Sequence, residues 1–179
     1  EDGSTYYPLS LQYRPYTADN EFVRETSIGG DILEDGSKEN RSYFGNTSKI
    51  SNEYDLDAVL NAKELVEASG ADIPIIVAME AKNPVVMSEF EADVDAIVVG
   101  FQISHNALFE VMLGLHEPQG LLPIQFPADM ETVEEQLEDV AHDMTPYEDS
   151  DGNVYDFGFG LNYGGQIEDD RTSTYVTKE

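Results

Sequence analysis

The side chains that could carry chemistry in this sequence are mostly carboxylates. The chain has 37 Asp and Glu residues, three histidines and no cysteine. The lack of cysteine excludes disulfides, thiolate metal sites and cysteine nucleophiles. His105, His116 and His142 have no partners at metal-ligand spacing, and neither a Gly-x-Ser-x-Gly turn nor a phosphate-binding loop occurs. We therefore expect no metal site and no cofactor.

The densest group of acids lies in residues 131–156, which hold ten acidic side chains and no Lys or Arg. Three interpretations are open: a solvated acidic face, adaptation to a salty environment, or calcium binding. The segment 149–153 resembles a calcium loop, but a helix-loop-helix calcium site needs glycine at position six and glutamate at position twelve. Gly152 stands at position four, so the segment predicts a turn.

The net charge of −28 limits the partners that this chain can have. A negative field repels phosphate backbones, so we expect no nucleic acid partner. An apolar fraction of 40% is too high for a wholly disordered chain, and 179 residues can bury a real core. No apolar run approaches the roughly 20 residues that cross a bilayer, and no signal-peptide pattern opens the sequence. We expect a soluble protein without a membrane partner, and the sequence leaves its compartment, cytoplasmic or secreted, open.

Residues 1–51 carry turn-forming residues throughout and sustain no helical or strand period. They predict a long irregular region with one short strand near Leu9–Tyr13. A segment of this length without regular structure is usually functional or disordered. Its aromatic residues favour order.

Residues 52–164 alternate between helical and strand patterns. The first predicted elements are a helix over 55–69, capped by Asp55 and ended by Gly70, and a strand over 73–79 buried on both faces. A short helix from Asn83-Pro84, a buried strand over 96–101 and a helix capped by Ser104 follow. The last elements are a strand over 121–126, a short helix opened by Asp129 and an aromatic strand within 154–161.

Such alternation predicts an α/β fold with a partly parallel sheet sandwiched between helices. Only three convincing parallel strands are visible, so we expect the sheet to be incomplete without preceding strands and the chain to be the C-terminal part of something larger. The predicted division is 1–51 for an irregular active-site loop region, 52–164 for the α/β sandwich domain and 165–179 for a C-terminal tail.

The alternating region also carries motifs in a fixed order. They are Ile73–Met79 followed by Asn83-Pro84-Val85, Ala96–Gly100 leading to Gln102, Asn106–Gly114, Glu117–Pro123 with Pro127, and Tyr155–Tyr163. In this order they resemble the C-terminal α/β sandwich domain of glycoside hydrolase family 3, the family of β-glucosidases and related exo-acting enzymes. Many members carry a glycine-rich turn at 101–105 and an arginine at Leu121, so these departures indicate a divergent subfamily.

The resemblance implies chemistry that is shared between domains. In this family an aspartate nucleophile lies on a (β/α)₈ barrel, and a loop of the sandwich domain supplies a glutamate acid/base. A barrel needs about 250 residues, more than this chain holds. The implied partner is therefore an N-terminal barrel chain or a missing N-terminal part of the same enzyme, and the assembled enzyme could form a dimer.

By position, residues 38–44 correspond to the acid/base loop. The resemblance makes Glu39 the candidate acid/base, with Arg41, Tyr43 and Phe44 as candidate substrate-binding residues, although many relatives have glycine before the glutamate where this chain has Lys38. The alternative is that Glu39 is an ordinary surface glutamate. We expect Arg41 to face away from Glu39, because a guanidinium opposes the raised pKa that a proton donor needs.

The aromatic residues of the first region suggest two roles. Tyr13, Tyr16, Tyr43 and Phe44 could form a platform on which sugars stack, or they could pack the loop on its own side chains.

The leading hypothesis is that the chain is the C-terminal part of a retaining β-glucosidase that removes terminal β-linked glucose. Its substrate could instead be a β-xyloside or a β-glucan. The alternative from another class is a non-catalytic α/β interaction or carbohydrate-binding domain. We also expect the chain not to fold stably alone, because missing strands would leave a sheet edge and apolar faces uncovered.

Overall fold

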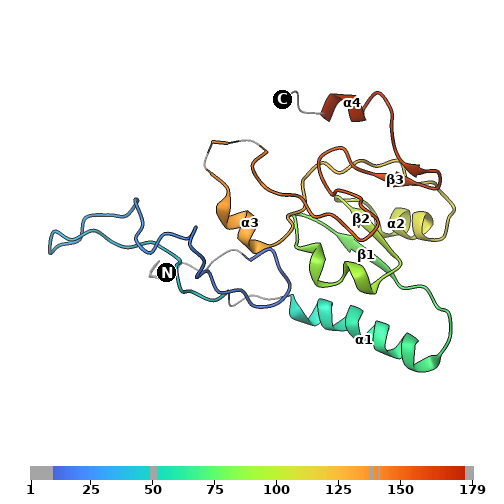
Figure 1. Cartoon of the computed structure of the whole chain (residues 1–179), viewed down its shortest axis with the longest axis horizontal. Coiled ribbons are helices and arrows are strands. Elements are labelled where there is room, and N and C mark those ends of the chain that lie inside the picture. Colours follow the sequence, from blue (N-terminus) through green and yellow to red (C-terminus); the bar gives the residue numbers. More distant parts are fainter. Residues whose placement is uncertain (1–9, 49–51, 138, 141, 176–179) are drawn as a thin grey trace.

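The structure, a computed structural model, describes residues 10–48, 52–137, 139–140 and 142–175 of the chain. Figure 1 shows a body of helices and strands, and a long irregular segment that extends away from it. We call this segment, residues 17–48, the arm. The body contains α1 (Glu53–Ser69), β1 (Ile76–Glu80), the 3₁₀ turns η1 (Met87–Glu89) and η2 (Glu91–Asp93), β2 (Ala96–Gly100), α2 (His105–Met112), α3 (Met130–Glu135), β3 (Leu161–Asn162), β4 (Gly165–Gln166) and α4 (Thr172–Tyr175).

The centre of the body is the parallel pair β1 and β2, with Ile76 opposite Ala96 and Glu80 opposite Gly100. Helix α2 packs against both strands. Val77 and Met79 contact the core that includes Leu56 of α1. The side chain of Glu80, the residue after Met79, points to the other face, because side chains alternate along a strand, and its carboxylate lies 3.9 Å from His105 at the start of α2. The predicted α/β fold is confirmed.

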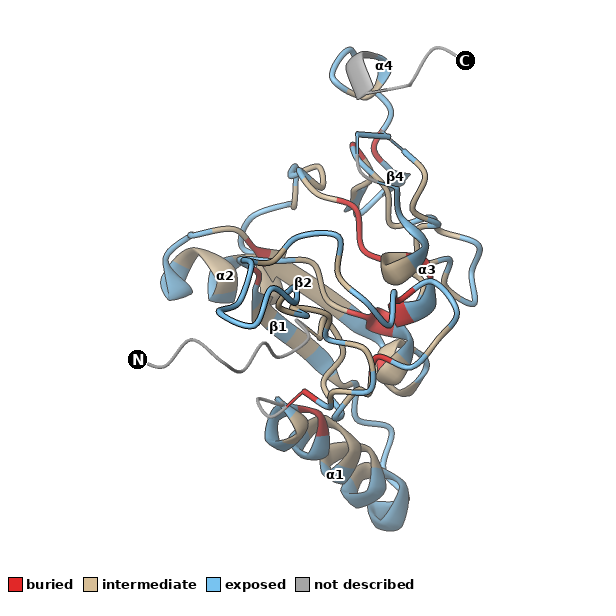
Figure 2. Cartoon of the chain, turned by 90° about the vertical axis from the view of Figure 1, so that its left-hand side faces the viewer, coloured by how far each residue is buried: buried red, intermediate tan, exposed pale blue. Residues whose placement is uncertain are grey.

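The hydrophobic core forms where α1, the strands and the segment before α3 meet. Phe126, Leu56 and Met87 are among its most buried side chains, and Phe90 and Ala81 complete the cluster. Figure 2 shows buried residues beside α3 and at the start of α1. The main core cluster therefore lies in the body, and the buried Ala18 and Val23 of the arm lie outside it.

The helix signals in the sequence were largely correct. Helix α1 ends at Gly70, whose φ of 65° is the left-handed conformation that glycine allows, as predicted. Its N-cap is Asn52, so the predicted cap Asp55 is wrong and lies in the first turn instead. Ser104 caps α2 and Asp129 caps α3, each accepting a backbone N–H three residues on, as predicted.

The predicted strands over 121–126 and 154–161 are wrong. Pro123 and Pro127 have no N–H to donate to a ladder. Gly158 takes a φ of 79° and turns the chain. The two segments instead exchange isolated bonds, such as Leu122 N–H donating to Phe159 O at 2.7 Å and Phe126 N–H to Tyr155 O at 3.0 Å.

Two further predictions need correction. The helix expected from Asn83-Pro84 begins only at Met87, because Val86 is extended and its N–H donates to Leu11 O at 3.0 Å. The strand expected near Leu9–Tyr13 is absent from residues 10–13, where Leu11 O accepts the N–H of Val86 without forming a ladder. Leu9 lies outside the described residues.

Strand β1 is not buried on both faces as predicted. Its residues alternate between exposed and half-buried, and Ile76 is 39% exposed. Val77 and Met79 face the core, whereas the opposite face is only partly covered. The three-part division of the chain stays a prediction; the β3–β4 hairpin pairs Leu161 with Gln166, across the expected boundary at 164.

The acidic segment forms α3 and a predicted turn. Asp149 accepts the N–H groups of Asp151 and Asn153, and its carboxylate oxygens also accept from the Asn153 amide and the Tyr155 hydroxyl. These local donors favour the charged carboxylate and hold the pKa of Asp149 below its usual range despite its partial burial. Among the described helices, none has the length and apolar character needed to cross a bilayer.

Candidate functional site

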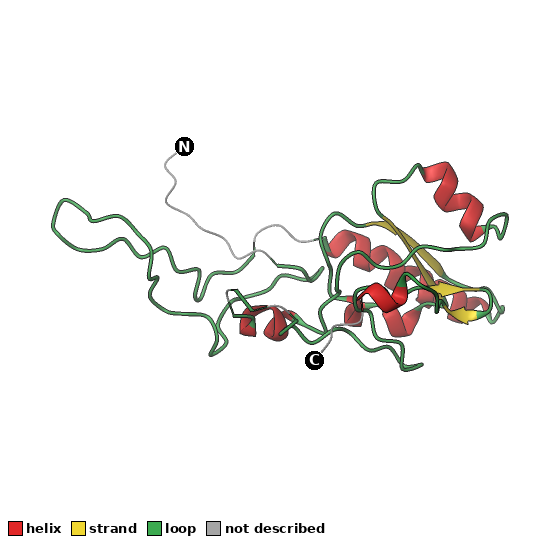
Figure 3. Ribbon diagram, turned by 90° about the horizontal axis from the view of Figure 1, so that it is seen from above, coloured by secondary structure: helices red, strands yellow, loops and turns green. Residues whose placement is uncertain are grey.

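The candidate acid/base lies on the arm, which consists of two antiparallel limbs. At its base Thr17 pairs with Thr47, and their hydroxyl oxygens are 2.7 Å apart. Near its tip Ile32 pairs with Lys38. Figure 3 shows from a second direction that the arm reaches well beyond the body.

The limbs are joined by polar contacts more than by apolar packing. Asn40 is central, because its amide oxygen accepts the N–H groups of Ser27 and Ser42 at 2.8 and 3.1 Å and its amide nitrogen donates to Glu25 O at 3.0 Å. The Ser27 hydroxyl accepts the Arg41 N–H at 2.8 Å. Side chains at 27 and 40 thus order the backbone directly after Glu39 and the facing limb at residues 25 and 27.

Gly30 is required where the limbs approach each other next to Glu39. Its φ is 128°, a conformation that residues with a Cβ rarely adopt. A Cβ placed there would lie 2.1 Å from the Glu39 carbonyl oxygen, which is backbone and cannot move aside like a flexible side chain. The position of Glu39 therefore depends on a glycine nine residues earlier.

The Glu39 side chain is held by Arg41, contrary to the expectation that Arg41 faces elsewhere. Arg41 Nε donates to Glu39 Oε2 at 2.7 Å, and its Nη2 donates to Asp31 Oδ2 at 2.8 Å. The Arg41 guanidinium, and to a lesser degree the Asp31 N–H, hold the pKa of Glu39 below its usual range. Arg41 and Glu39 lie two residues apart on the same limb, and Asp31 on the facing limb also binds the guanidinium and so fixes its direction.

Tyr43 and Phe44 occupy the turn by which the arm returns to the body. The Tyr43 hydroxyl donates to Glu134 Oε2 of α3 at 2.8 Å. Partial burial and this carboxylate raise the pKa of Tyr43 to about 12. Phe44 is half-buried, and its N–H donates to the Ser42 hydroxyl at 3.0 Å.

The four aromatic residues of the suggested sugar platform lie in two places. The Tyr16 hydroxyl accepts from Asn20 at 3.0 Å and interacts electrostatically with Tyr43 and Glu134, so Tyr16 and Tyr43 both lie near α3. Tyr13 packs edge-to-face on Phe90, with ring centroids 5.6 Å apart, in the body. A single platform of all four rings is therefore not formed.

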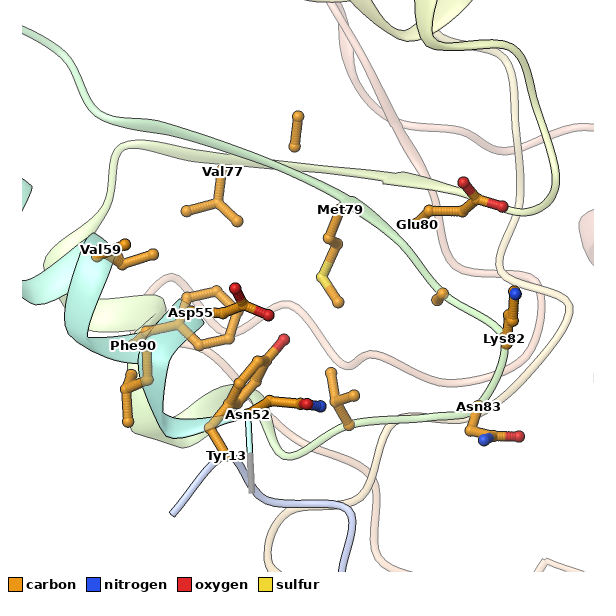
Figure 4. Close-up of a pocket in the computed structure, with 15 residues that line it drawn as sticks. Tyr13, Asn52, Asp55, Val59, Val77, Met79, Glu80, Lys82, Asn83 and Phe90 are labelled. Atoms are coloured by element: carbon orange, nitrogen blue, oxygen red, sulfur yellow. The ribbon is translucent and has the colours of Figure 1, made fainter. Parts of the chain in front are cut away.

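The cavity in Figure 4 lies between α1 and β1, with a volume of about 560 Å³. Its floor is apolar, formed by residues such as Val77 and Met79, and its rim carries Tyr13, Asp55 and Lys82. Of the residues suggested for sugar binding only Tyr13 lines it, whereas Glu39, Arg41, Tyr43 and Phe44 do not. The arm and the cavity are thus separate features.

Two contacts of the site escaped the sequence analysis, those of Asp31 and Glu134. Asp31 lies eight residues before Glu39, and only the antiparallel pairing of the limbs brings it to Arg41. Glu134 is 91 residues from Tyr43, and no local signal connects them. In the described part of the chain, His, Asp and Glu side chains form no group of three or more that could hold a metal ion.

Comparison with known proteins adds the identity of the domain. Residues 32–163 match the family model for the glycosyl hydrolase family 3 C-terminal domain. "Probable beta-glucosidase C" from Aspergillus flavus and from Aspergillus oryzae are each 35% identical over 91 residues, covering 51% of this chain and 13% of the relative. "Beta-glucosidase C" from Emericella nidulans is 30% identical over 93 residues, covering 52% of this chain and 14% of the relative.

The matched region is thus only a small share of those relatives, and no solved structure matches the chain significantly. The family match begins at Ile32 on the arm and ends at Tyr163, after the body's parallel strands and α3. Because it covers most of the sequence, this chain belongs to glycoside hydrolase family 3, as its C-terminal domain.

Proposed function

We propose that the chain is the C-terminal part of a retaining β-glucosidase-like glycoside hydrolase. Glu39 acts as acid/base toward an aspartate nucleophile on a barrel outside this chain, and terminal β-linked glucose is the substrate. The observation that carries the proposal is the placement of Glu39 on an arm that extends beyond the sandwich body of a family 3 domain. A carboxylate in that position can reach a second domain.

The surface of the arm supports a second domain as its neighbour. Ile28, Ile32 and Leu33 are 69%, 81% and 46% exposed. Three large apolar side chains within six residues of each other are unfavourable in water and suit an interface. In the proposed enzyme they pack on the barrel and bring Glu39 to its catalytic face.

The proton balance of the reaction requires a change at Glu39 on assembly. With Arg41 as its partner, Glu39 is ionised at neutral pH and has no proton to give. A retaining glycosidase places its two carboxyl groups about 5–5.5 Å apart, and a neighbouring carboxylate raises the pKa of the acid. We propose that the barrel aspartate and loss of solvent raise the pKa of Glu39, while Arg41 turns toward Asp31 or a sugar hydroxyl.

Each half of the reaction then uses one protonation state. Protonated Glu39 donates its proton to the departing glycosidic oxygen as the barrel aspartate bonds to the anomeric carbon. The resulting Glu39 carboxylate takes a proton from water, which attacks the same carbon and releases the sugar with retained configuration. Arg41, Tyr43 and Phe44 lie near enough along the chain to contact the sugar.

The test is a Glu39→Gln substitution in the enzyme assembled with its barrel. We expect turnover of glucosides with poor leaving groups to fall by about 10²–10⁴-fold, because the departing oxygen then receives no proton. Aryl glucosides with acidic phenols should still form the glycosyl-enzyme and stall before hydrolysis. Azide added to Glu39→Ala should restore the rate and give a glycosyl azide of retained configuration.

Glu34→Gln is the matched control, because Glu34 is an exposed carboxylate at the tip of the same arm. It should leave turnover near the parent value. Equal, small losses for good and poor leaving groups in Glu39→Gln, without azide rescue, would remove Glu39 from the mechanism.

A second candidate is a non-catalytic interaction or carbohydrate-binding domain. The observation in its favour is the Glu39–Arg41 ion pair, which leaves Glu39 satisfied within the arm and without a proton to donate. Calorimetric titration of glucose and cello-oligosaccharides separates the two. Binding without hydrolysis, both with and without a barrel, would favour this candidate.

A further inference from the structure

The arm meets α3 of the body at the Tyr43–Glu134 contact. The phenol of Tyr43 and the carboxylate of Glu134 form a 2.8 Å hydrogen bond between residues 91 positions apart. Tyr43 lies four residues after Glu39, so a shift of Tyr43 is transmitted over a short length of chain.

The arm end of this contact is fixed by the backbone around it. Tyr43 O accepts the Asn46 N–H at 2.9 Å, which closes a turn, and the Gly45 N–H donates to Ala18 O at 2.8 Å. Gly45 has a φ of 73°, and Ala18 is fully buried. Tyr43 therefore projects from a defined turn and not from a loose loop.

The body end is fixed by the buried side of α3. Met130 and Thr132 are 3% and 6% exposed. The Thr132 N–H donates to the cap residue Asp129 at 2.8 Å, and the Thr132 hydroxyl accepts the Thr145 N–H at 2.9 Å. Glu134 follows on the same helix, so it is a carboxylate held on a rigid support.

We propose that Tyr43 and Glu134 are positioning residues, whose hydrogen bond holds the arm against α3 and thereby sets where Glu39 meets the barrel. The kinetic part of this inference rests on the proposed function, whereas the anchoring part does not. Tyr16 lies near the pair, since its phenol interacts electrostatically with Glu134 and Tyr43.

Detachment of the arm from α3, which we call arm opening, can be measured without any substrate. Arg41-Ser42 is a tryptic site two residues from Tyr43, and Lys38-Glu39 is another. Where opening is fast relative to cleavage, the cleavage rate follows the population of the open arm. In the enzyme assembled with its barrel, we expect Tyr43→Phe and Glu134→Ala each to accelerate cleavage in the arm about three- to tenfold, since each removes one hydrogen bond.

Three variants make this measurement specific. Glu134→Gln keeps an oxygen that accepts from the phenol, so it should cleave more nearly like the parent. The double variant Tyr43→Phe/Glu134→Ala should cleave no faster than the faster single variant, because both remove the same bond. Tyr147→Phe removes a comparable 2.9 Å bond from a tyrosine to Glu91 in the body and should leave arm cleavage unchanged.

The kinetic readout is a difference between leaving groups. Tyr43→Phe should lower kcat for poor leaving groups about three- to tenfold, and should change KM and the rate of glycosyl-enzyme formation from acidic phenols much less.

Unchanged arm cleavage in both Tyr43→Phe and Glu134→Ala would overturn the anchoring and with it the inference. Accelerated cleavage with parent kinetics, where Glu39→Gln is inactive on poor leaving groups, would overturn the positioning role alone. If Glu39→Gln retains activity, the proposed function fails while the anchoring stands on its cleavage result.

Discussion

The arm and the body of this domain are stabilised by different interactions. In the body, side chains such as Phe126 and Leu56 are removed from water, and burial of this kind contributes about 1.5–3 kcal/mol for each large apolar side chain. In the arm, order comes from hydrogen bonds of Asn40 and Ser27, each contributing about 1 kcal/mol net, and from the solvent-exposed pair of Arg41 with Glu39. The region proposed to carry the chemistry is thus the one that least resembles a core.

The comparison teaches why the site can move while the fold stays. Local opening costs least where few apolar contacts are lost and the hydrogen bonds are open to solvent. The arm meets both conditions beyond its base, where Ile28 and Ile32 are exposed. Adjustment on contact with a barrel therefore requires little disruption of the body.

The largest expected difference between the regions is in the effect of deleting an apolar side chain. Phe126→Ala should cost about 3–5 kcal/mol, because it leaves a cavity in a fully buried site. Ile32→Ala removes a side chain that is 81% exposed and should change stability by less than about 0.5 kcal/mol. Hydrogen exchange of the body amides measures both. Comparable losses would mean that the arm shares the core.

A smaller effect is expected from adding one methyl group to the arm. Gly30→Ala should destabilise the pairing of the two limbs of the arm by about 1–3 kcal/mol, because of the positive φ and the clash with the Glu39 carbonyl oxygen. Gly29→Ala is the control, since a Cβ there meets no atom within 4 Å. Exchange protection at residues 38–41 should fall in Gly30→Ala alone. Equal protection in both variants would contradict the close approach.

The Glu39–Arg41 pair predicts a change that shows in titration more than in stability. Arg41 holds the pKa of Glu39 in the folded arm below its ordinary value. The pair therefore stabilises the folded arm at pH values above the ordinary glutamate pKa, and this contribution is lost as the pH falls through the lowered pKa. Arg41→Ala should return the pKa of Glu39 toward its ordinary value, measured by carbon-detected NMR. Arg24→Ala, on the same arm, should leave it unchanged. A Glu39 pKa unaffected by Arg41→Ala would show that the pair does not form in solution.

The smallest expected effect concerns the acidic segment of the body. Ten like charges in residues 131–156 repel one another, and 0.1 M salt screens this repulsion over about 10 Å. Raising sodium chloride from low to moderate concentration should raise the melting temperature by roughly 2–4 °C. Asp151→Asn should reduce the increase. A flat response would exclude a repulsive face, and a selective increase with calcium would indicate bound metal.

The sequence predicted the helices better than the strands, for a physical reason. Caps are local: Ser104, Asp129 and Gly70 act within three residues of themselves, so their signals can be read without the fold. Strand pairing is not local. The apolar run at 121–126 has the pattern of a strand, but Pro123 and Pro127 cannot donate to a ladder with a neighbouring segment. Only tertiary structure reveals that outcome.

The site divides in the same way. Family resemblance brought Glu39, Arg41, Tyr43 and Phe44 to attention, and their roles remain predictions. The direction of Arg41 was wrongly expected because it depends on Asp31, which the facing limb supplies. Tyr43 has its partner on α3, and no spacing within residues 1–51 could have indicated Glu134.

Helix α3 has a consequence for how such an enzyme would respond to heat. Its inner side is held by the buried Met130 and Thr132, while Glu134 reaches a solvent-accessible phenol. On warming, the arm would detach before the helix that supports it melts. With Glu39 as the proton donor, activity would decline below the melting temperature of the body and return on cooling. Irreversible inactivation would begin only when the core around Phe126 opened.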